Sequence, residues 1–371
     1  MTPLGLYIHI PFCVRKCRYC DFASWAGRES DMVHYVDILC KEIVQRAEAC
    51  GHPAADTVFF GGGTPSLLPP ELYLRIAHAL RQNFSIMSDA EWTVECNPGT
   101  LTQNFAHALH ESGCNRLSLG LQAAQPRLLQ ALGRIHTAEQ AAQAISFARD
   151  AGIHNINLDL MLGLPGQTET DLRETLDFAL SLSPQHLSCY ALILEEGTPL
   201  YDDVQAGRVI MPSDDADREL YGLCRSILHK NGYRQYEISN FAQPGFFCRH
   251  NVNCWRREEY LGFGCAAHGL WKNERRANPP TLNGYLHGEA PELTAISPEE
   301  AMFESVMLGL RLTGGIDESD FLRRHGNVLM DVYGTRLQPA LDDGRLLRQN
   351  GHLLLSEHGM DVMNSVLVAL L

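Results

Sequence analysis

The sequence has too little cysteine for a disulfide-stabilised scaffold and no apolar run long enough for a membrane helix. Its 12 cysteines are spread over 371 residues, well below the density of disulfide scaffolds, so reduced thiols in the cytoplasm are the simpler expectation. A spanning helix needs about 18 or more consecutive apolar residues, and no such run occurs. These absences argue against a disulfide framework and against an integral membrane protein.

Positive charge is also scarce. Lys and Arg number 30 against 44 Asp and Glu, which gives a net charge of −14. Capture of nucleic acid needs clustered Lys and Arg to neutralise phosphates, whereas here the basic residues form short pairs such as Arg256-Arg257. A secretory leader is not expected, because its cleavage would remove a cysteine motif that begins at Cys13. We therefore expect a cytoplasmic protein without a nucleic-acid partner.

The cysteines that are present include one compact group, Cys13, Cys17 and Cys20, directly after an apolar run. Three thiolates on one short loop can bind three irons of a 4Fe-4S cluster, and an iron without a cysteine is then open to chemistry. The alternative is structural zinc, but a zinc module usually has a second ligand pair about 12 to 20 residues further on. None follows Cys20, so the spacing favours the cluster.

The amino-terminal half alternates short β-rich runs with amphipathic segments, which indicates an α/β fold with a parallel sheet. The predicted strands are Leu6 to Ile10, Thr57 to Phe60, Trp92 to Glu95, Arg116 to Leu119, Ile156 to Leu160 and His186 to Ile193. The predicted helices are Met32 to Ala49, Pro70 to Asn83, Leu101 to Ser112, Ala138 to Ala151 and Thr170 to Leu182. In such sheets the chemistry gathers beyond the carboxyl ends of the strands.

The loop Gly61-Gly62-Gly63 follows the second predicted strand. Three glycines permit backbone angles that other residues avoid and let the chain approach a ligand closely, while Pro65 fixes the exit direction. Taken alone, the glycines are more simply explained by a tight strand-to-helix turn. Their place after the cysteine loop favours a ligand site.

Several further motifs give the chain a family resemblance. They are Tyr7 to Phe12 leading into the cysteines, Gly61 to Ser66, Glu95 to Thr100, Gly163 to Thr168, Tyr236 to Ala242 and His250 to Trp255. In these segments the chain resembles the radical S-adenosylmethionine (SAM) superfamily, in the branch of oxygen-independent coproporphyrinogen oxidases and HemW-like haem chaperones. The resemblance implies a partial (β/α)6 barrel that holds a 4Fe-4S cluster and SAM.

The resemblance also implies roles for single residues. Cys13, Cys17 and Cys20 would ligate the cluster. The residues expected to bind cofactor are Tyr7, Gly61, Gly62, Gly63, Thr64, Glu95, Gln122, Arg134 and Asp159. Among them, carbonyls of the glycine loop would hold the SAM ammonium with Glu95 facing the same end, Arg134 would pair with its carboxylate, and Gln122 and Asp159 would contact the ribose. Taken singly, each side chain could equally make a structural hydrogen bond.

Two functions share this core. A coproporphyrinogen III dehydrogenase decarboxylates two propionates through a 5′-deoxyadenosyl radical, and its pattern has another cysteine where this chain has Phe22, as well as a longer arm than the twelve residues before Cys13. A haem chaperone instead binds haem and delivers it to acceptor proteins at the membrane. Because both departures count against the enzyme, the chaperone is the preferred interpretation. A homodimer is left open.

The haem ligand is expected in His250-Asn251-Val252-Asn253-Cys254-Trp255. Imidazole is a good axial ligand for haem iron, so His250 is the candidate, with Trp255 stacking on the porphyrin. Cys254 stands where the chaperone pattern has tyrosine; it could be an alternative thiolate ligand, although a buried, inert cysteine is the simpler interpretation.

The domains are predicted as residues 1–285 for the barrel with its extension and 286–371 for a small, mainly helical, winged-helix-like domain. Ser297-Pro298-Glu299-Glu300 is typical of a helix start. Helical periods then fill Ala301 to Leu312 and Leu329 to Leu341, and Leu346 to Leu355 indicates a hairpin turning at Asn350-Gly351. Such a domain would cover the open side of the barrel or bind a partner.

Overall fold

A computed structural model describes residues 4–370, and an open twelve-stranded sheet forms its centre. Six neighbouring strands run parallel in chain order. They are β1 (Leu4–Ile10), β4 (Ala54–Gly62), β5 (Ser85–Cys96), β6 (Arg116–Gln122), β7 (Asn155–Leu162) and β8 (His186–Ala191). The predicted partial barrel is confirmed, and within the described residues β1 and β8 do not pair to close it.

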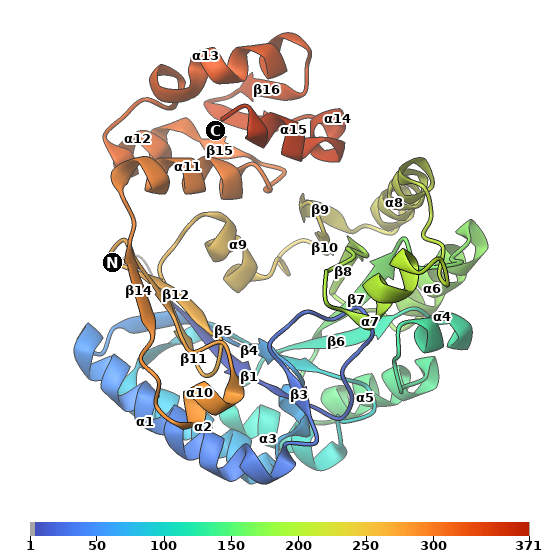
Figure 1. The fold of residues 1–371 in the computed structure, drawn as a ribbon, viewed down its shortest axis with the longest axis vertical. Helices are drawn as coiled ribbons and strands as arrows, with labels where there is room; N and C mark the ends of the chain where they lie inside the picture. Colours follow the sequence, from blue (N-terminus) through green and yellow to red (C-terminus); the bar gives the residue numbers. More distant parts are fainter. Residues whose placement is uncertain (1–3, 371) are drawn as a thin grey trace.

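The helices between these strands cover the outer face of the sheet (Figure 1). They are α1 (Met32–Cys50), α2 (Pro70–Asn83), α3 (Gln103–Ser112), α4 (Pro126–Ala131), α5 (Ala138–Asp150) and α6 (Glu169–Ser181). The start of α5 is fixed by a capping box between Thr137 and Gln140, and that of α6 by one between Thr168 and Asp171. Apart from the short α4, these are the helices that the apolar period predicts.

The two faces of the parallel strands differ in chemistry. Side chains alternate along a strand: in β6, Leu117 and Leu119 join the large apolar core, whereas Arg116 and Ser118 are buried polar residues. The same alternation places Asn157 and His186 inside the curved sheet, where His186 Nδ1 lies 2.6 Å from Asn157 Oδ1. The concave face is therefore a hydrogen-bonded polar interior.

Additional short strands, which were not predicted from the sequence, extend both edges of the sheet. Beyond β8 lie β10 (Asn240–Ala242) and β9 (Arg234–Glu237); beyond β1 lie β11 (Tyr260–Phe263), β12 (His268–Trp271), β13 (Glu274–Ala277) and β14 (Glu292–Ala295). Other elements of this region are β2 (Phe12–Cys13), β3 (Trp25–Ala26), α7 (Pro199–Gln205), α8 (Asp214–Lys230), α9 (Arg249–Trp255) and α10 (Leu282–Leu286). Because β14 still pairs with β13, the large sheet continues past the predicted boundary at residue 285.

A carboxyl-terminal unit with its own apolar core lies above α9 (Figure 1). Its elements are α11 (Pro298–Gly309), β15 (Ile316–Asp317), α12 (Glu318–His325), α13 (Leu329–Asp342), β16 (Leu346–Gln349), β17 (His352–Leu355), α14 (Glu357–Asp361) and α15 (Met363–Val368). The expected hairpin is present as β16 and β17. Across residues 4–370, no helix has both the length and the apolar character required to cross a bilayer.

Candidate cofactor site at the carboxyl ends of the strands

A cavity of about 280 Å³ opens where the parallel strands end. The three cysteines of the motif line it, as do most of the predicted cofactor residues, namely Gly62, Gly63, Thr64, Glu95, Gln122, Arg134 and Asp159. These residues lie in the carboxyl-terminal parts of the strands, or in the loops that follow them, of five successive β-α units. They are far apart in the sequence and come together only in the folded chain. Tyr7, Gly61 and His250 are absent from the lining.

The cysteine loop forms one wall of this cavity. All three thiols are half-buried, and the Thr64 hydroxyl donates to Cys13 Sγ at 3.6 Å. Within residues 4–370 no three His, Cys, Asp or Glu side chains come close enough to hold one metal ion.

The glycine loop passes very close to the end of β1. Gly62 has a φ of +106°, and a Cβ there would overlap the His9 ring. A Cβ at Gly63 would lie 2.7 Å from the carbonyl oxygen of Phe12, because the Gly63 amide donates to the Ile10 carbonyl at 2.8 Å. Close packing thus requires glycine at both positions, and it places this backbone on the cavity wall.

Arg134 has an unused donor at this cavity. Its Nη1 donates to Asn97 Oδ1 at 2.8 Å, and Asn97 Nδ2 donates to the Thr64 hydroxyl at 2.8 Å. The guanidinium lies over the Tyr19 ring at 5.9 Å. Its buried Nε has no hydrogen-bond partner in the described part of the chain. Since a guanidinium suits planar, bidentate recognition, this fork fits a ligand carboxylate.

Two carboxyl groups lie on the inner face of the sheet. Glu95 Oε2 accepts from the Gly62 amide at 3.2 Å, and burial, followed by the charge of Asp159, raises the pKa of Glu95 to about 8. Asp159 accepts from Asn157 Nδ2 at 2.8 Å and from the Ser118 hydroxyl at 3.2 Å, and burial raises its pKa as well. A ligand ammonium or hydroxyl would relieve the cost of these buried charges.

Gln122 occupies a strained position at the end of β6. Its φ is +66°, and the pairing of β6 with β7 shifts register between Gly120 and Gln122. Its Oε1 accepts from the Tyr190 hydroxyl at 3.3 Å. Backbone strain of this kind is often found at binding sites. Tyr190 and Asn97 line the cavity too. Asn97 belongs to the predicted motif at the end of the third strand, but no role was predicted for either residue.

His250 lies apart from this cavity, on the buried side of α9. Only 5% of its surface is exposed; its Nδ1 is 2.9 Å from the Thr57 hydroxyl, and its ring stacks on Phe59 at 5.0 Å. Burial lowers the pKa of His250 to about 4 and raises that of the Cys254 thiol to about 12. In this arrangement His250 is buried and neutral at pH 7, and Cys254 is a neutral thiol.

Tyr7 also points into the interior. Its hydroxyl lies 2.9 Å from His9 Nδ1, and His9 Nε2 lies 2.8 Å from the Ala23 carbonyl. Because a carbonyl only accepts, Nε2 carries the proton and the Tyr7 hydroxyl donates to Nδ1. Tyr7 thus orients His9 behind the glycine loop. At Gly61 a Cβ would lie 2.9 Å from Glu95 Oε2, so the glycine leaves room for the Glu95 side chain.

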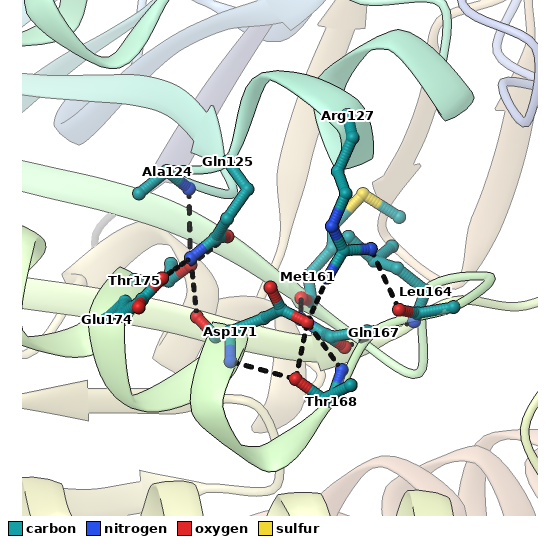
Figure 2. Close-up of polar contacts among 11 residues, drawn as sticks. Ala124, Gln125, Arg127, Met161, Leu164, Gln167, Thr168, Asp171, Glu174 and Thr175 are labelled. Atoms are coloured by element: carbon teal, nitrogen blue, oxygen red, sulfur yellow. Dashed lines mark hydrogen bonds and ion pairs between the residues drawn. The ribbon is translucent and has the colours of Figure 1, made fainter.

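The Gly163 to Thr168 motif forms a brace beside the cavity (Figure 2). Gln167 Oε1 accepts from the Leu164 amide at 3.1 Å, and its Nε2 donates to the Met161 carbonyl at 3.2 Å. Arg127 donates to the Gly166 carbonyl at 2.9 Å and also pairs with Asp171 at the start of α6. Only Met161 of this group lines the cavity, so the motif fixes the end of β7.

Comparison with known proteins identifies two families along the chain. Residues 7–179 match the model of the radical SAM superfamily, and residues 296–362 match the HemN C-terminal domain. A curated relative, the heme chaperone HemW of Bacillus subtilis, is 36% identical over 330 residues, covering 87% of each chain. HemW of Escherichia coli is 34% identical over 382 residues, covering 100% of this chain and 99% of that one.

A solved structure has the same fold. Coproporphyrinogen III oxidase (HemN) of Escherichia coli, described as a radical SAM enzyme, superposes with a TM-score of 0.86 over 99% of this chain and 90% of that one. The two sequences are 23% identical, so the likeness establishes the fold alone.

Proposed function

Because the chain belongs to the radical SAM superfamily and, within it, to the family of the HemW relatives, we propose that it is a haem chaperone that binds a 4Fe-4S cluster, SAM and haem. The observation that carries this proposal is the sequence identity of 34 to 36% with relatives named heme chaperone HemW, in alignments that cover at least 87% of this chain and of each relative. Haem delivery to acceptor proteins at the membrane, a cytoplasmic location and a homodimer belong to the same proposal.

The cavity fits the first two groups. Cys13, Cys17 and Cys20 would hold the cluster, and the unpartnered Nε of Arg134 would receive the SAM carboxylate. Glu95 would accept from the SAM ammonium beside the glycine loop, and Asp159 and Gln122 would bind its hydroxyls. When bound, a reduced cluster can supply the electron that cleaves the sulfonium bond of SAM.

The chain's own residues prepare this site for a charged ligand. The Asn97 side chain accepts a hydrogen bond from Arg134 Nη1 and donates one to the Thr64 hydroxyl. The guanidinium is therefore oriented before the ligand binds. Glu95, with its pKa raised to about 8, can release its proton to solvent when an ammonium group binds next to it. Phe22, which stands where the dehydrogenase pattern has another cysteine, also lines the cavity, and 60% of its surface is exposed.

The test uses the full chain, reconstituted with iron and sulfide under anaerobic conditions. Saturable haem binding followed by absorbance, and transfer of the haem to apomyoglobin, are expected. Cys17→Ala should abolish the visible absorbance of the cluster, whereas Cys40→Ala, on the outer helix α1, should leave it unchanged.

A parallel incubation with coproporphyrinogen III, SAM and reductant separates the two functions that share the fold. The proposal expects no decarboxylated product, with HemN assayed alongside to show that the reductant works. Decarboxylation by this chain, without saturable haem binding, would replace the chaperone with the enzyme.

A further inference from the structure

A second and larger cavity, about 690 Å³, separates the sheet from the carboxyl-terminal unit. We call it the interdomain cleft. One wall comes from β9 and α9, and the other from α11, α12 and β17. It shares no lining residue with the cofactor cavity. Its volume lies within the range of roughly 300 to 1,000 Å³ that is typical of small-molecule sites.

The wall on the sheet side carries aromatic surface. Tyr236 and Phe247 stack on one another with ring centroids 4.5 Å apart, and Trp255 lies further along α9. Phe321 of α12 contributes from the opposite wall. Tyr236 and Phe321 are themselves buried. The accessible aromatic surface of the cleft therefore comes from Phe247, which is 40% exposed, and from the part of Trp255 that the Arg311 guanidinium, 4.3 Å from its ring, leaves open. Such surface suits a flat, apolar ligand, since offset and edge contacts with a planar macrocycle are favourable.

Arginines at the same cleft provide anchors for acidic groups. Arg234 and Arg256 are exposed lining residues, and no ion pair of either occurs within residues 4–370. The carboxylates of the lining are already engaged, since Glu258 and Asp320 pair with Arg324 and Asp317 caps α12. Two uncommitted guanidinium groups fit a ligand with two carboxylates.

One histidine of the cleft has a nitrogen free for a metal. His352 Nδ1 lies 3.1 Å from the Asn350 carbonyl, which can only accept, so Nδ1 carries the proton and Nε2 presents its lone pair. A backbone carbonyl on Nδ1 is a common way of orienting an imidazole ligand. His352 is on β17, the central strand of a three-stranded sheet, and is half-buried. It is therefore held on a rigid element.

The other histidine of the cleft is less suited. Ser305 Oγ donates to the Ala301 carbonyl at 2.9 Å, so it accepts from His325 Nε2, also at 2.9 Å. The remaining lone pair of His325 is on Nδ1, next to its own backbone on α12, where a bulky metal complex cannot easily approach. Of the two, His352 is the better ligand.

We propose that the interdomain cleft is the haem site of this chain, with His352 Nε2 as the axial ligand and with Arg234 and Arg256 binding the two propionates. The proposal rests on the function proposed above and moves the ligand from His250 to the carboxyl-terminal unit. Trp255, the last residue of the His250 segment, then contacts the macrocycle, while His250 stays in the interior.

The test is a haem titration of the full chain followed by absorbance and by electron paramagnetic resonance. His352→Ala should weaken haem binding about tenfold or more and remove the signal of imidazole-bound iron, and added imidazole should restore that signal. His325→Ala is the matched control and should bind like wild type. His250→Gln, which keeps a hydrogen-bonding group in the interior, should retain the wild-type spectrum.

The propionate contacts have an independent test. The double variant Arg234→Ala, Arg256→Ala should lose about tenfold in affinity for haem, but not for haem dimethyl ester, which has no carboxylates. Arg218→Ala, exposed on α8, is the control.

The outcomes separate the two proposals. A wild-type chain that binds no haem overturns the chaperone function and the site together. A wild-type chain that binds haem normally while His352→Ala keeps both affinity and spectrum overturns the site alone; loss of the imidazole signal in His250→Gln would then return the ligand to α9.

Discussion

Replacement of Arg134 is the sharpest test of the cofactor cavity. Its Nη1 is committed to Asn97, and its buried Nε has no partner among the described residues. An unpartnered buried donor costs about 1 to 3 kcal/mol, which a ligand carboxylate would recover on binding. Truncating one member of such a charged pair typically costs about 2 to 4 kcal/mol, or roughly 30- to 1,000-fold in affinity. Arg134→Ala should therefore raise the Kd for SAM by that factor.

Arg134→Lys refines this expectation. Lysine keeps the positive charge near Tyr19, where the guanidinium now lies 5.9 Å from the ring, but it cannot present a planar fork. We expect the cluster to form normally and the affinity for SAM to fall about tenfold. Arg173→Lys, in an exposed pair with Glu169 on α6, is the matched control.

The assay is equilibrium dialysis of labelled SAM against anaerobically reconstituted protein, with iron content and visible absorbance measured on the same samples. A variant with less cluster would show that Arg134 also supports the cysteine loop through Tyr19. Unchanged SAM affinity in both Arg134 variants, with full cluster, would refute the assignment of this side chain to the ligand carboxylate.

Three further predictions concern stability and protons. Gly62→Ala should lower the free energy of unfolding by about 2 to 4 kcal/mol in urea titrations, because its Cβ would meet the His9 ring; Gly51→Ala, with φ of +76° but nothing within 4 Å, should cost only about 1 kcal/mol. Burial lowers the pKa of His136 and His250 to about 4, so below about pH 6.5 the unfolded chain binds protons that the folded chain does not, and each histidine should lower the free energy of unfolding by roughly 2 kcal/mol at pH 5, whereas the raised pKa of Glu95 acts in the opposite sense. An equal change of the urea midpoint between pH 7 and pH 5 in wild type and in His250→Gln would contradict the contribution of that histidine. SAM binding at pH 7 should release nearly one proton from Glu95, whose pKa is raised to about 8; calorimetry in two buffers should detect that release in wild type and not in Glu95→Gln.

Most of the barrel could be predicted because each parallel strand packs an apolar face against helices. The period of the apolar residues thus located the six strands and most of their helices, although β5 begins at Ser85 and not at Trp92. Its early part pairs with Ala54 and Ala55 before a register shift in β4, which no pattern in a single strand reveals. The added strands beyond β1 and β8, of three or four residues each, are too short to show a period for the same reasoning.

The cofactor cavity was partly predictable for a related reason. Loops after parallel strands converge at one edge, so motif residues such as Glu95 and Asp159 were expected to meet. The roles of Asn97 and Tyr190 were not predicted, since they depend on contacts between different units. The alternation of polar and apolar residues in β6 and β7 was a usable signal of the polar interior, because strands buried on both faces are normally apolar throughout.

The haem-ligand prediction treated the segment His250 to Trp255 as one site, and helical geometry divides it. Residues three or four apart share a helix face, so His250 and Cys254 belong to one face of α9, and Val252 and Trp255 to another. The structure buries His250 against Phe59 and places Val252 and Trp255 on the interdomain cleft. A contiguous motif on a helix therefore serves two surfaces. Its interior half supports the sheet. Under the proposed haem site, its exposed half would take the ligating group from elsewhere, and His352 on the opposite wall would supply it.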